Sequence, residues 1–332
     1  MNKILLQNME RNISESNAIS NFNGVGDDLF NIIPNIEKAR NISVVDAKEL
    51  IKSEFYKNWV SKNKPCLIKN AIKHWPAIQK FRNLDYWLSA CDNFDMSVYP
   101  HMNHMVKNRH KADLIETTFY DAVKRLFKNQ DFILNLSRNE ISETNQFSKL
   151  IKEMPDFSFL SNELKPRGYP HRRFFMYRRA STAWHYHNMD ETLMCQVNGS
   201  KKVALFSPKT KRVKEISNYL TKERYLEGET LDPNITVDPI IAYVEEGDAL
   251  YIPPYWLHGV APVDGEIGFT LAYCWGSPIH ILGDFSNYFV RKFHKNRFLP
   301  LNRHTFTTPF VSLYAAVLHT FYKLKGEEKT YR

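Results

Sequence analysis

The stretch from residue 181 to residue 208 reads STAWHYHNMDETLMCQVNGSKKVALFSP. It carries two histidines two positions apart, His185 and His187, and then a Gly-Ser-Lys-Lys turn that leads into an apolar run. Side chains at positions i and i+2 of a β-strand project to the same side of the sheet. One metal ion can therefore accept both imidazoles if this segment is a strand.

A second stretch, EEGDALYIPPYWLHGV, covers residues 245–260 and supplies a third histidine, His258. We expect His258 at the end of a strand that follows a Gly-Asp turn and a Pro-Pro stop. Strands distant in sequence pair across the mouth of a jelly roll. Three protein ligands that leave other coordination positions open suit a catalytic iron better than a closed structural zinc site. The alternative of ordinary strand histidines is disfavoured by the joint pattern of HxH, Gly-x5-Pro and a later His.

The chain around these stretches alternates short strands with turns. After Pro170 the sequence predicts strands, separated by Gly, Pro, Asn or Asp, in RRFFMYRR, TLMCQV, KKVALFS, IAYVEEGD, ALYIPP and IGFTLAYCW. Such a series is typical of an antiparallel barrel or jelly roll. Before Pro170, periodicity predicts helices at 44–60, 85–91 and 119–127 and strands at 66–68, 94–100 and 131–137. The predicted fold class is mainly β with flanking helices.

Composition narrows the class of protein further. The 332 residues, 43% of them apolar, suffice for one large domain with an appendage. The net charge of +9 is only a weak indication of an anionic partner, because the acidic residues are spread along the chain. The four cysteines form no CxxC pair, which argues against a disulfide scaffold or a cysteine-built zinc site. No apolar run reaches the length of a signal-peptide core or a membrane span, so we expect a cytoplasmic protein without a membrane partner.

The two histidine stretches resemble a known family. Gly247 to His258 looks like the second motif of the cupin superfamily, and the first stretch is similar to the metal strand of the JmjC-type, or cupin-8, oxygenases. Further segments of that family are similar to KPCLIKNAIKHWPA, CQVNGSKKVALFSP and FTLAYCW. The resemblance runs from about Val45 to Pro278. It implies a double-stranded β-helix, or jelly-roll, core and an Fe(II)- and 2-oxoglutarate-dependent dioxygenase that acts as a hydroxylase or demethylase.

Composition and periodicity at the two ends of the chain, and the resemblance between them, predict a domain organisation. Residues 1–40 are expected to be a loosely ordered leader, residues 41–277 the JmjC/cupin-like oxygenase domain, and residues 278–332 a C-terminal helical segment.

Several site residues follow from the resemblance, position by position. His185 and His258 match the two histidine ligands of the iron. Lys201 matches the lysine that pairs with the distal carboxylate of 2-oxoglutarate, and Thr182 matches a hydroxyl on the same carboxylate. Trp275 matches an aromatic residue near the substrate, and a place in the core is the equal alternative.

Two departures from the family pattern leave alternatives open. The family has His-x-Asp where this chain has His187, so the third ligand is either His187 or a nearby carboxylate, Asp190 or Glu191. The strand at 131–137 lacks a tyrosine that often supports 2-oxoglutarate. The alternatives are a three-histidine cupin dioxygenase that uses no keto acid and a non-catalytic cupin-fold binding protein.

The substrate and partners stay open at this point. Members of the family hydroxylate protein side chains, demethylate lysine or hydroxylate a modified tRNA base, so we expect a protein side chain, a tRNA base or a small molecule as substrate. Basic clusters at 101–111 and 165–173 would suit RNA or an acidic peptide, and solvated surface is the alternative. An apolar stripe on a predicted helix at about 305–324 consists of Phe310, Tyr314, Val317, Leu318 and Phe321. It either folds onto the N-terminal helix around Leu50 or pairs two chains, as in several family members. We expect a homodimer.

Overall fold

The computed structural model describes residues 29–98, 115–128, 140–160, 164–235, 237–263, 265–298, 307–326 and 329. The predicted strand at 131–137, the basic cluster at 101–111 and the first 28 residues lie outside these ranges. Within the described ranges, no helix has both the length and the apolar character needed to cross a bilayer.

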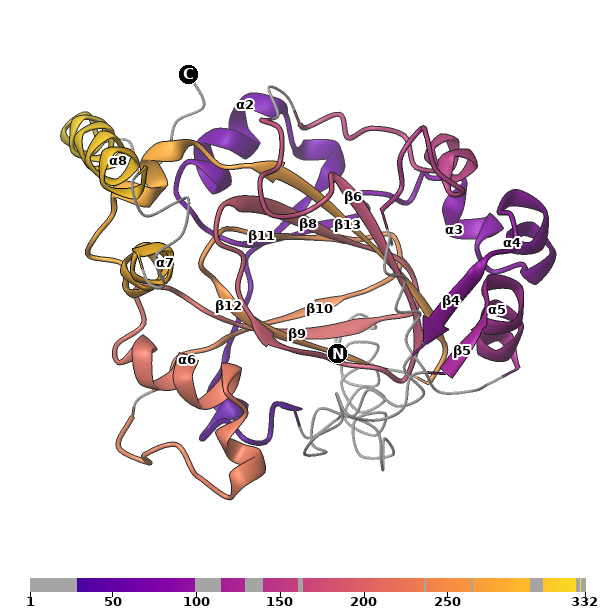
Figure 1. The fold of residues 1–332 in the computed structure, drawn as a ribbon, viewed down its shortest axis with the longest axis horizontal. Coiled ribbons are helices and arrows are strands. Elements are labelled where there is room, and N and C mark those ends of the chain that lie inside the picture. Colours follow the sequence, from indigo (N-terminus) through magenta and orange to yellow (C-terminus); the bar gives the residue numbers. More distant parts are fainter. Residues whose placement is uncertain are drawn as a thin grey trace, which may run out of the picture.

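Two sheets face each other and form the barrel at the centre of Figure 1. The first sheet has the strand order β1 (Arg40–Asn41), β10 (Ile240–Val244), β9 (Lys201–Phe206), β12 (Leu257–Pro262) and β7 (Thr182–His185). The second has the order β2 (Val44–Asp46), β3 (Cys66–Lys69), β11 (Ala249–Ile252), β8 (Asp190–Asn198), β13 (Ile267–Gly276) and β6 (Arg172–Arg178). From β6 to β13 every pairing is antiparallel and the chain passes repeatedly between the sheets, which confirms the predicted jelly roll.

Glycine sets the turns that place the central strands. Gly199, between β8 and β9, and Gly247, between β10 and β11, have φ of 74° and 89°. This left-handed region carries no steric penalty for glycine. The N–H of Gly247 donates to the carbonyl of Gln196 at 2.9 Å, which ties the β10–β11 turn to β8.

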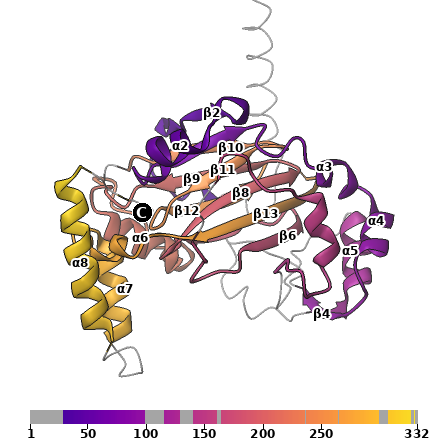
Figure 2. The ribbon, with the colours of Figure 1, turned by 90° about the horizontal axis from the view of Figure 1, so that it is seen from above.

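Helices cover the barrel at its ends and on its outer faces (Figures 1 and 2). Their bounds are α2 (Lys52–Phe55), the π-helical η4 (Tyr56–Val60), α3 (Ala77–Lys80), α4 (Leu84–Ala90), α5 (Phe119–Phe127), α6 (Val213–Thr221), α7 (Tyr288–Phe298) and α8 (Thr308–Leu324). Short 3-10 turns are η2 (Ile36–Lys38), η3 (Ala47–Glu49), η6 (Ser148–Glu153), η7 (Arg224–Glu227) and η8 (Ile279–Gly283), and β4 (Asp95–Val98) pairs with β5 (Ile115–Thr118).

The helix predicted over 44–60 is wrong in its first part. Val44 to Asp46 form β2, which pairs in parallel with β3, and helical structure starts only at Ala47. Pairing with a neighbouring strand therefore overrides the local helical periodicity.

Three clusters of buried side chains make up the core. The largest lies between the second sheet and the N-terminal helices, and it includes Trp87 and Trp275. A small cluster fills the barrel between the sheets, with Val203 and Leu205 on β9. A third covers the outside of the first sheet and includes Leu29 and Phe30, which belong to the predicted leader and are buried here.

The C-terminal helix does not cover the N-terminal helix around Leu50. Instead, α8 packs against η8 and lies beside α7, as Figure 2 shows. Ala315 of α8 is fully buried against Gly283, where any side chain larger than hydrogen would collide with the α8 backbone. The opposite face of α8 is left exposed.

Candidate metal centre

The three predicted histidines meet at one end of the barrel. His185 ends β7 and lies directly opposite His258 of β12, and His187 follows two residues later. One nitrogen from each ring lies within 4.8 Å of the others. The sequence predicted His258 at the end of a strand. Because β12 begins at Leu257, His258 instead lies at the start of one.

Hydrogen bonds turn the same nitrogen of every ring toward the centre. The Nδ1 atoms of His185 and His258 donate to the carbonyls of Ala183 and Trp256 at 2.8 and 2.9 Å. Nδ1 of His187 bonds the hydroxyl of Thr192 at 2.8 Å. Each Nε2 is left to bind, the usual arrangement of a metal-ligating histidine with a second partner. Metal–nitrogen bonds of about 2 Å need only a small closure of these rings, so the residues fit an ion.

Two backbone features lie where the segments that carry the histidines meet. Tyr255, three residues before His258, has a φ of 66°, and its N–H donates to the carbonyl of His187 at 2.8 Å. A buried non-glycine residue in this region stores local strain, which is common beside functional sites. Gly259 lets the indole of Trp184 approach to a distance that a Cβ would not allow. Both features lie beside the pairing of β7 with β12 that brings His185 opposite His258.

The electrostatic environment keeps the histidines neutral. Burial lowers the pKa of His185 and lowers the pKa of both His187 and His258 well below the usual range. The neighbouring imidazoles lower the pKa values of His187 and His258 further. Metals bind the neutral imidazole, so these rings are in the binding form at neutral pH.

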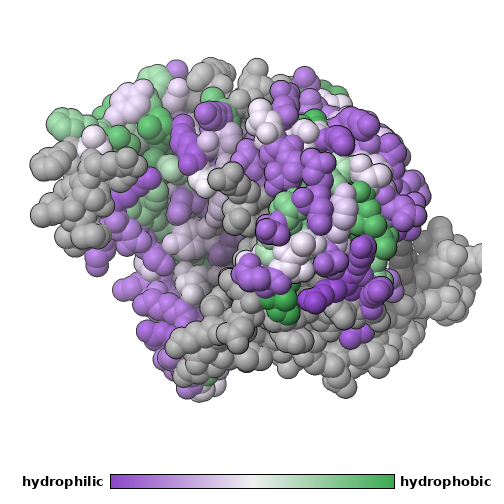
Figure 3. Space-filling view, turned by 45° about the vertical axis from the view of Figure 1, so that its right-hand side comes forward, coloured by the Kyte–Doolittle hydropathy of each residue, from purple (hydrophilic) through white to green (hydrophobic). Residues whose placement is uncertain are grey.

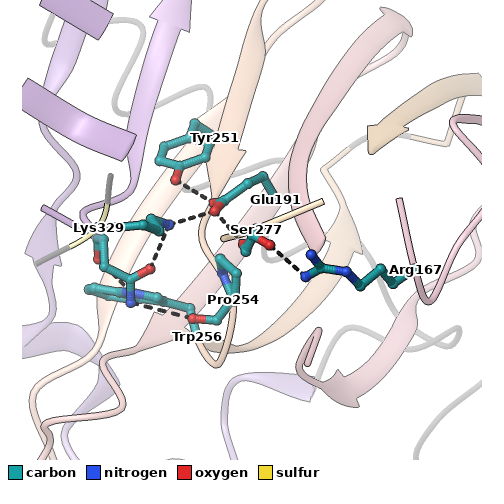
Figure 4. A network of polar contacts seen from close by, with 8 residues as sticks. Arg167, Glu191, Tyr251, Pro254, Trp256, Ser277 and Lys329 are labelled. Atoms are coloured by element: carbon teal, nitrogen blue, oxygen red, sulfur yellow. Dashed lines mark hydrogen bonds and ion pairs between the residues drawn. The ribbon is translucent and has the colours of Figure 1, made fainter. Parts of the chain in front are cut away.

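Glu191, one of the two carboxylates considered as third ligand, points away from the histidines. Neighbouring strand residues face opposite sides of a sheet, and Thr192 faces His187. The Glu191 carboxylate accepts bonds from Tyr251 at 2.7 Å, from Lys329 at 2.6 Å and from Ser277 (Figure 4). These three partners belong to a network outside the barrel.

The carboxylate of Asp190, the other candidate ligand, holds the backbone of residues 167–169 in place. Its oxygens accept the backbone N–H groups of Arg167, Gly168 and Tyr169 at 2.7 to 2.9 Å. Among the described residues, the group able to hold one ion contains the three histidines and neither carboxylate. The geometry therefore favours His187 over Asp190 and Glu191 as the third donor.

Lys201 and Lys202 lie on opposite faces of β9, as strand alternation requires. Lys201 is 5% exposed and points into the barrel, with its ammonium 4.0 Å from the ring centre of Tyr177. Lys202 is half-buried on the outside, where its ammonium lies over the rings of Phe30 and Tyr243. Burial lowers the pKa of Lys201 to about 7. No described carboxylate lies within ion-pair distance of the Lys201 ammonium.

Thr182 and Trp275, the remaining predicted site residues, have different surroundings. Thr182 lies opposite Val260 of β12, so it faces the barrel interior with that residue. Trp275 is fully buried in the largest core cluster and stacks on Tyr251 at 6.1 Å. It lies on the same outer face as Glu191, its register partner. The structure thus gives Trp275 the core position that was the alternative to a place in the substrate pocket.

Two residues of the basic cluster at 165–173 lie near the three histidines. The sequence had suggested that this cluster is a charged outer surface. The ring of Tyr169 meets His187 edge-on at 4.9 Å, and the guanidinium of Arg173 lies 4.1 Å from the Tyr169 ring centre. Arg172, by contrast, forms an ion pair with Asp156 at 2.6 Å. Alternation in RRFFMYRR predicts that Arg172 and Arg173 face opposite sides, but only the sheet register shows which of them faces inward.

Comparison with known sequences places the chain in a family. The sequence profile of the cupin-like domain matches residues 52–280, well over half of the chain. The chain belongs to this family. The JmjC-type members among its relatives confirm the resemblance read from the histidine motifs.

Relatives of this cupin-like chain carry varied names. Jumonji C domain-containing protein 5 of Drosophila melanogaster is 26% identical over 252 residues, which cover 71% of this chain and 60% of that protein. The human bifunctional peptidase and (3S)-lysyl hydroxylase JMJD7 is 24% identical, covering 66% and 80%. The tRNA wybutosine-synthesizing protein 5 of Gallus gallus is 23% identical, covering 70% and 77%. The chain therefore spans less than two thirds of the fruit-fly relative. Together with the histidine cluster, these relatives support an iron-dependent oxygenase.

Proposed function

We propose that this chain is an Fe(II)- and 2-oxoglutarate-dependent oxygenase that hydroxylates its substrate. The observation that carries the proposal is the presence of two complementary features in one barrel. Three neutral histidines lie at one end, and the buried ammonium of Lys201 lies further along without a described carboxylate beside it.

The spacing of these two features suits a dicarboxylate. His258 lies opposite Leu205 in the pairing of β12 with β9, and Lys201 is four residues from Leu205 on the same inward face. Four residues of strand span about 13 Å. A keto acid chelated at one end and an extended lysine side chain at the other together bridge that distance. A buried lysine without a partner favours binding of an anion, because the anion restores the charged form.

The chain's own residues divide the work. His185, His187 and His258 would hold Fe(II) on one face, so the remaining positions stay open to the keto acid and oxygen. Lys201 would bind the distal carboxylate, with the hydroxyl of Thr182 on the same inward side. Thr192 fixes the ring of His187. Bound iron with the keto acid supplies oxidation of a C–H bond, and the apolar barrel wall excludes water from that reaction.

A three-histidine dioxygenase that uses no keto acid is the second candidate. The observation that favours it is the neutral donor set, since Asp190 and Glu191 bond elsewhere. Lys201 distinguishes the two candidates, because an enzyme without a keto acid has no use for a buried cation at that position.

For the substrate, we propose a protein side chain, a tRNA base or a small molecule, and the names of two relatives support the first two of these. For the oligomeric state, we propose a homodimer through α8. Its outer face exposes Phe310 by 77%, Leu313 by 67% and Leu324 by 84%, and Figure 3 has apolar atoms at the upper left, where α8 lies. Exposed apolar surface of this kind marks interaction sites. Light scattering tests the dimer, and a mass of 39.1 kDa at micromolar concentration would exclude it.

Anaerobic titration with iron and then with 2-oxoglutarate tests the function. We expect one Fe(II) per chain and a weak visible charge-transfer band when 2-oxoglutarate is added. Iron binding without the band supports the dioxygenase that needs no keto acid, and no iron binding supports a binding protein.

The variant His258→Ala should lose the iron. The exposed His74 provides the matched control, and His74→Ala should keep it. Full iron loading in His258→Ala would contradict the assignment of the ligands.

A further inference from the structure

Arg173 brings a permanent positive charge to the wall of the barrel beside the histidines. Its guanidinium lies 4.1 Å from the ring centre of Tyr169, and that ring contacts His187 edge-on. Arg173 helps to lower the pKa values of His185 and His187, which is the effect of a nearby cation. The guanidinium of Arg173 therefore lies close to the candidate iron site, with the ring of Tyr169 between it and His187.

The guanidinium has hydrogen-bonding capacity left over. Its Nε atom is buried and has no hydrogen-bond partner in the described structure. No described carboxylate forms an ion pair with Arg173. The Nε of the neighbouring Arg172 also lacks a partner, but a terminal nitrogen of its guanidinium pairs with Asp156. The Arg173 side chain as a whole is only half-buried. A buried donor without a partner is unfavourable, and a ligand that accepts its bond removes the penalty.

The charge balance of the pocket strengthens the case for an anionic ligand. Three neutral histidines leave both charges of Fe(II) uncompensated, and Lys201 and Arg173 add two more. A bound 2-oxoglutarate contributes two negative charges and the nearby Asp190 carboxylate one, which still leaves one positive charge. An additional anion is therefore attracted to the pocket, and a cationic group is repelled.

From these observations we propose that Arg173 is a specificity-determining residue that binds an oxyanion on the substrate, beside the carbon to be oxidised. The assignment rests on the proposed function, since it concerns the substrate of the same site. A carboxylate fits the planar fork of the guanidinium best, because it can accept two parallel bonds from Arg173. A phosphate group offers the same chemistry. Substrates that present a cationic side chain to the iron are disfavoured.

The test measures the binding of small oxyanions to protein that is already loaded anaerobically with Fe(II) and 2-oxoglutarate. In this protein the ammonium of Lys201 is already paired with the carboxylate of 2-oxoglutarate, so it does not compete for the probe. Acetate and inorganic phosphate are the two probes, and acetamide is the neutral isostere of acetate. We expect acetate to bind more tightly than acetamide, and Arg173→Gln to weaken acetate binding by about tenfold or more. Tighter binding of phosphate than of acetate would identify a phosphate-bearing substrate.

Arg172→Gln is the matched control, because it removes the same charge from the adjacent residue on the opposite face. It should leave acetate binding unchanged, and Arg173→Lys should keep part of it. Equal affinity for acetate in wild type and Arg173→Gln, or an equal loss in Arg172→Gln, would overturn the proposal.

A second arm separates this proposal from the proposed function. If iron and 2-oxoglutarate do not bind, the oxygenase assignment fails on its own. The acetate titration is then made on metal-free Lys201→Gln protein, with and without Arg173→Gln. Loss of acetate selectivity in the double variant still supports an oxyanion site at Arg173, and no difference rejects it.

Discussion

Lys201 and Lys329 are both buried lysines, and their surroundings differ completely. Lys329 is 2% exposed, and its ammonium bonds Glu191 at 2.6 Å and the side-chain oxygen of Asn63 at 3.1 Å. Lys201 is 5% exposed and has the ring of Tyr177 beneath it, but no described carboxylate beside it. One cation is neutralised within the protein, and the other is not.

The difference separates a structural charge from a functional one. A buried ion pair must be complete to be tolerated, and the Glu191 network completes it with Tyr251 and Ser277 (Figure 4). A buried cation without a counter-ion lowers the stability of the folded protein. Such a residue is therefore expected where function requires it, for example in a ligand-binding site. Under the proposed function, the distal carboxylate of 2-oxoglutarate would supply the missing negative charge.

The largest effect is expected from breaking the complete pair. Lys329→Met leaves the Glu191 carboxylate buried and uncompensated, which should lower the free energy of unfolding by about 3–5 kcal/mol. Chemical denaturation measures it. Lys325→Met, an exposed lysine near the end of α8, is the control and should change stability little. A loss below about 1 kcal/mol in Lys329→Met would mean that the pair is not formed as described.

Removing the Lys201 ammonium should affect ligand binding without lowering the stability of the folded protein, the reverse of what is expected for Lys329. Lys201→Met should weaken 2-oxoglutarate binding by about 1.5–3 kcal/mol, because a charge-assisted bond is lost. It should not destabilise the folded protein at pH 6, where wild type must bury the charged amine. Titration followed by the charge-transfer band gives the first quantity, and denaturation gives the second. Unchanged 2-oxoglutarate affinity would remove Lys201 from the site.

The pH dependence sharpens the same contrast. The folded pKa of Lys201 is about 7, against 10.5 for an unperturbed lysine. Between these values the unfolded chain binds a proton that the folded chain does not, so the contribution of Lys201 to stability rises with pH across this window. In Lys201→Met that rise should be absent. Denaturation at pH 6 and pH 9 measures it, and an equal rise in both proteins would contradict the low pKa.

Co-substrate binding should take up a proton at Lys201. At pH 8 the free amine is mostly neutral, and the bound carboxylate restores its charged form. Calorimetry in buffers with different ionisation enthalpies should therefore detect uptake of nearly one proton. No uptake at pH 8 would mean that the ammonium is already charged or is not the carboxylate's partner.

The smallest effect is expected on the outer face of β9. Lys202 is half-buried and contacts the rings of Phe30 and Tyr243, so Lys202→Met should leave 2-oxoglutarate binding unchanged and alter stability by under about 1 kcal/mol. The same titration and denaturation experiments apply. A loss of 2-oxoglutarate binding as large as in Lys201→Met would mean that the register of β9 is wrong.

Much of the fold and of the metal centre could be predicted because the deciding patterns are local. The i, i+2 spacing of His185 and His187 gives both rings one side of a strand, and the barrel strands follow from short apolar runs between turns. The helix at 119–127 begins and ends as its apolar periodicity predicts. Lys201 and Lys202 alternate as neighbours on a strand must.

The remaining features depend on register and on distant contacts. Nothing local in Glu191 reveals that Lys329, 138 residues away, forms its ion pair. The inward direction of Arg173 follows from the pairing of β6 with β13, and Trp275 belongs to the core because its face of β13 is the outer one. The left-handed backbone of Tyr255 is set by its bond to His187 and not by residue type.

A crystal structure of the protein grown anaerobically with Fe(II) and 2-oxoglutarate would show whether the three histidines and Lys201 form one site. We predict one metal ion bound by the Nε2 atoms of His185, His187 and His258. We also predict the keto acid at that ion and its distal carboxylate within hydrogen-bond distance of the Lys201 ammonium. A metal held by Asp190 or Glu191, or a keto acid whose distal carboxylate binds another cation and leaves Lys201 unpaired, would contradict this prediction.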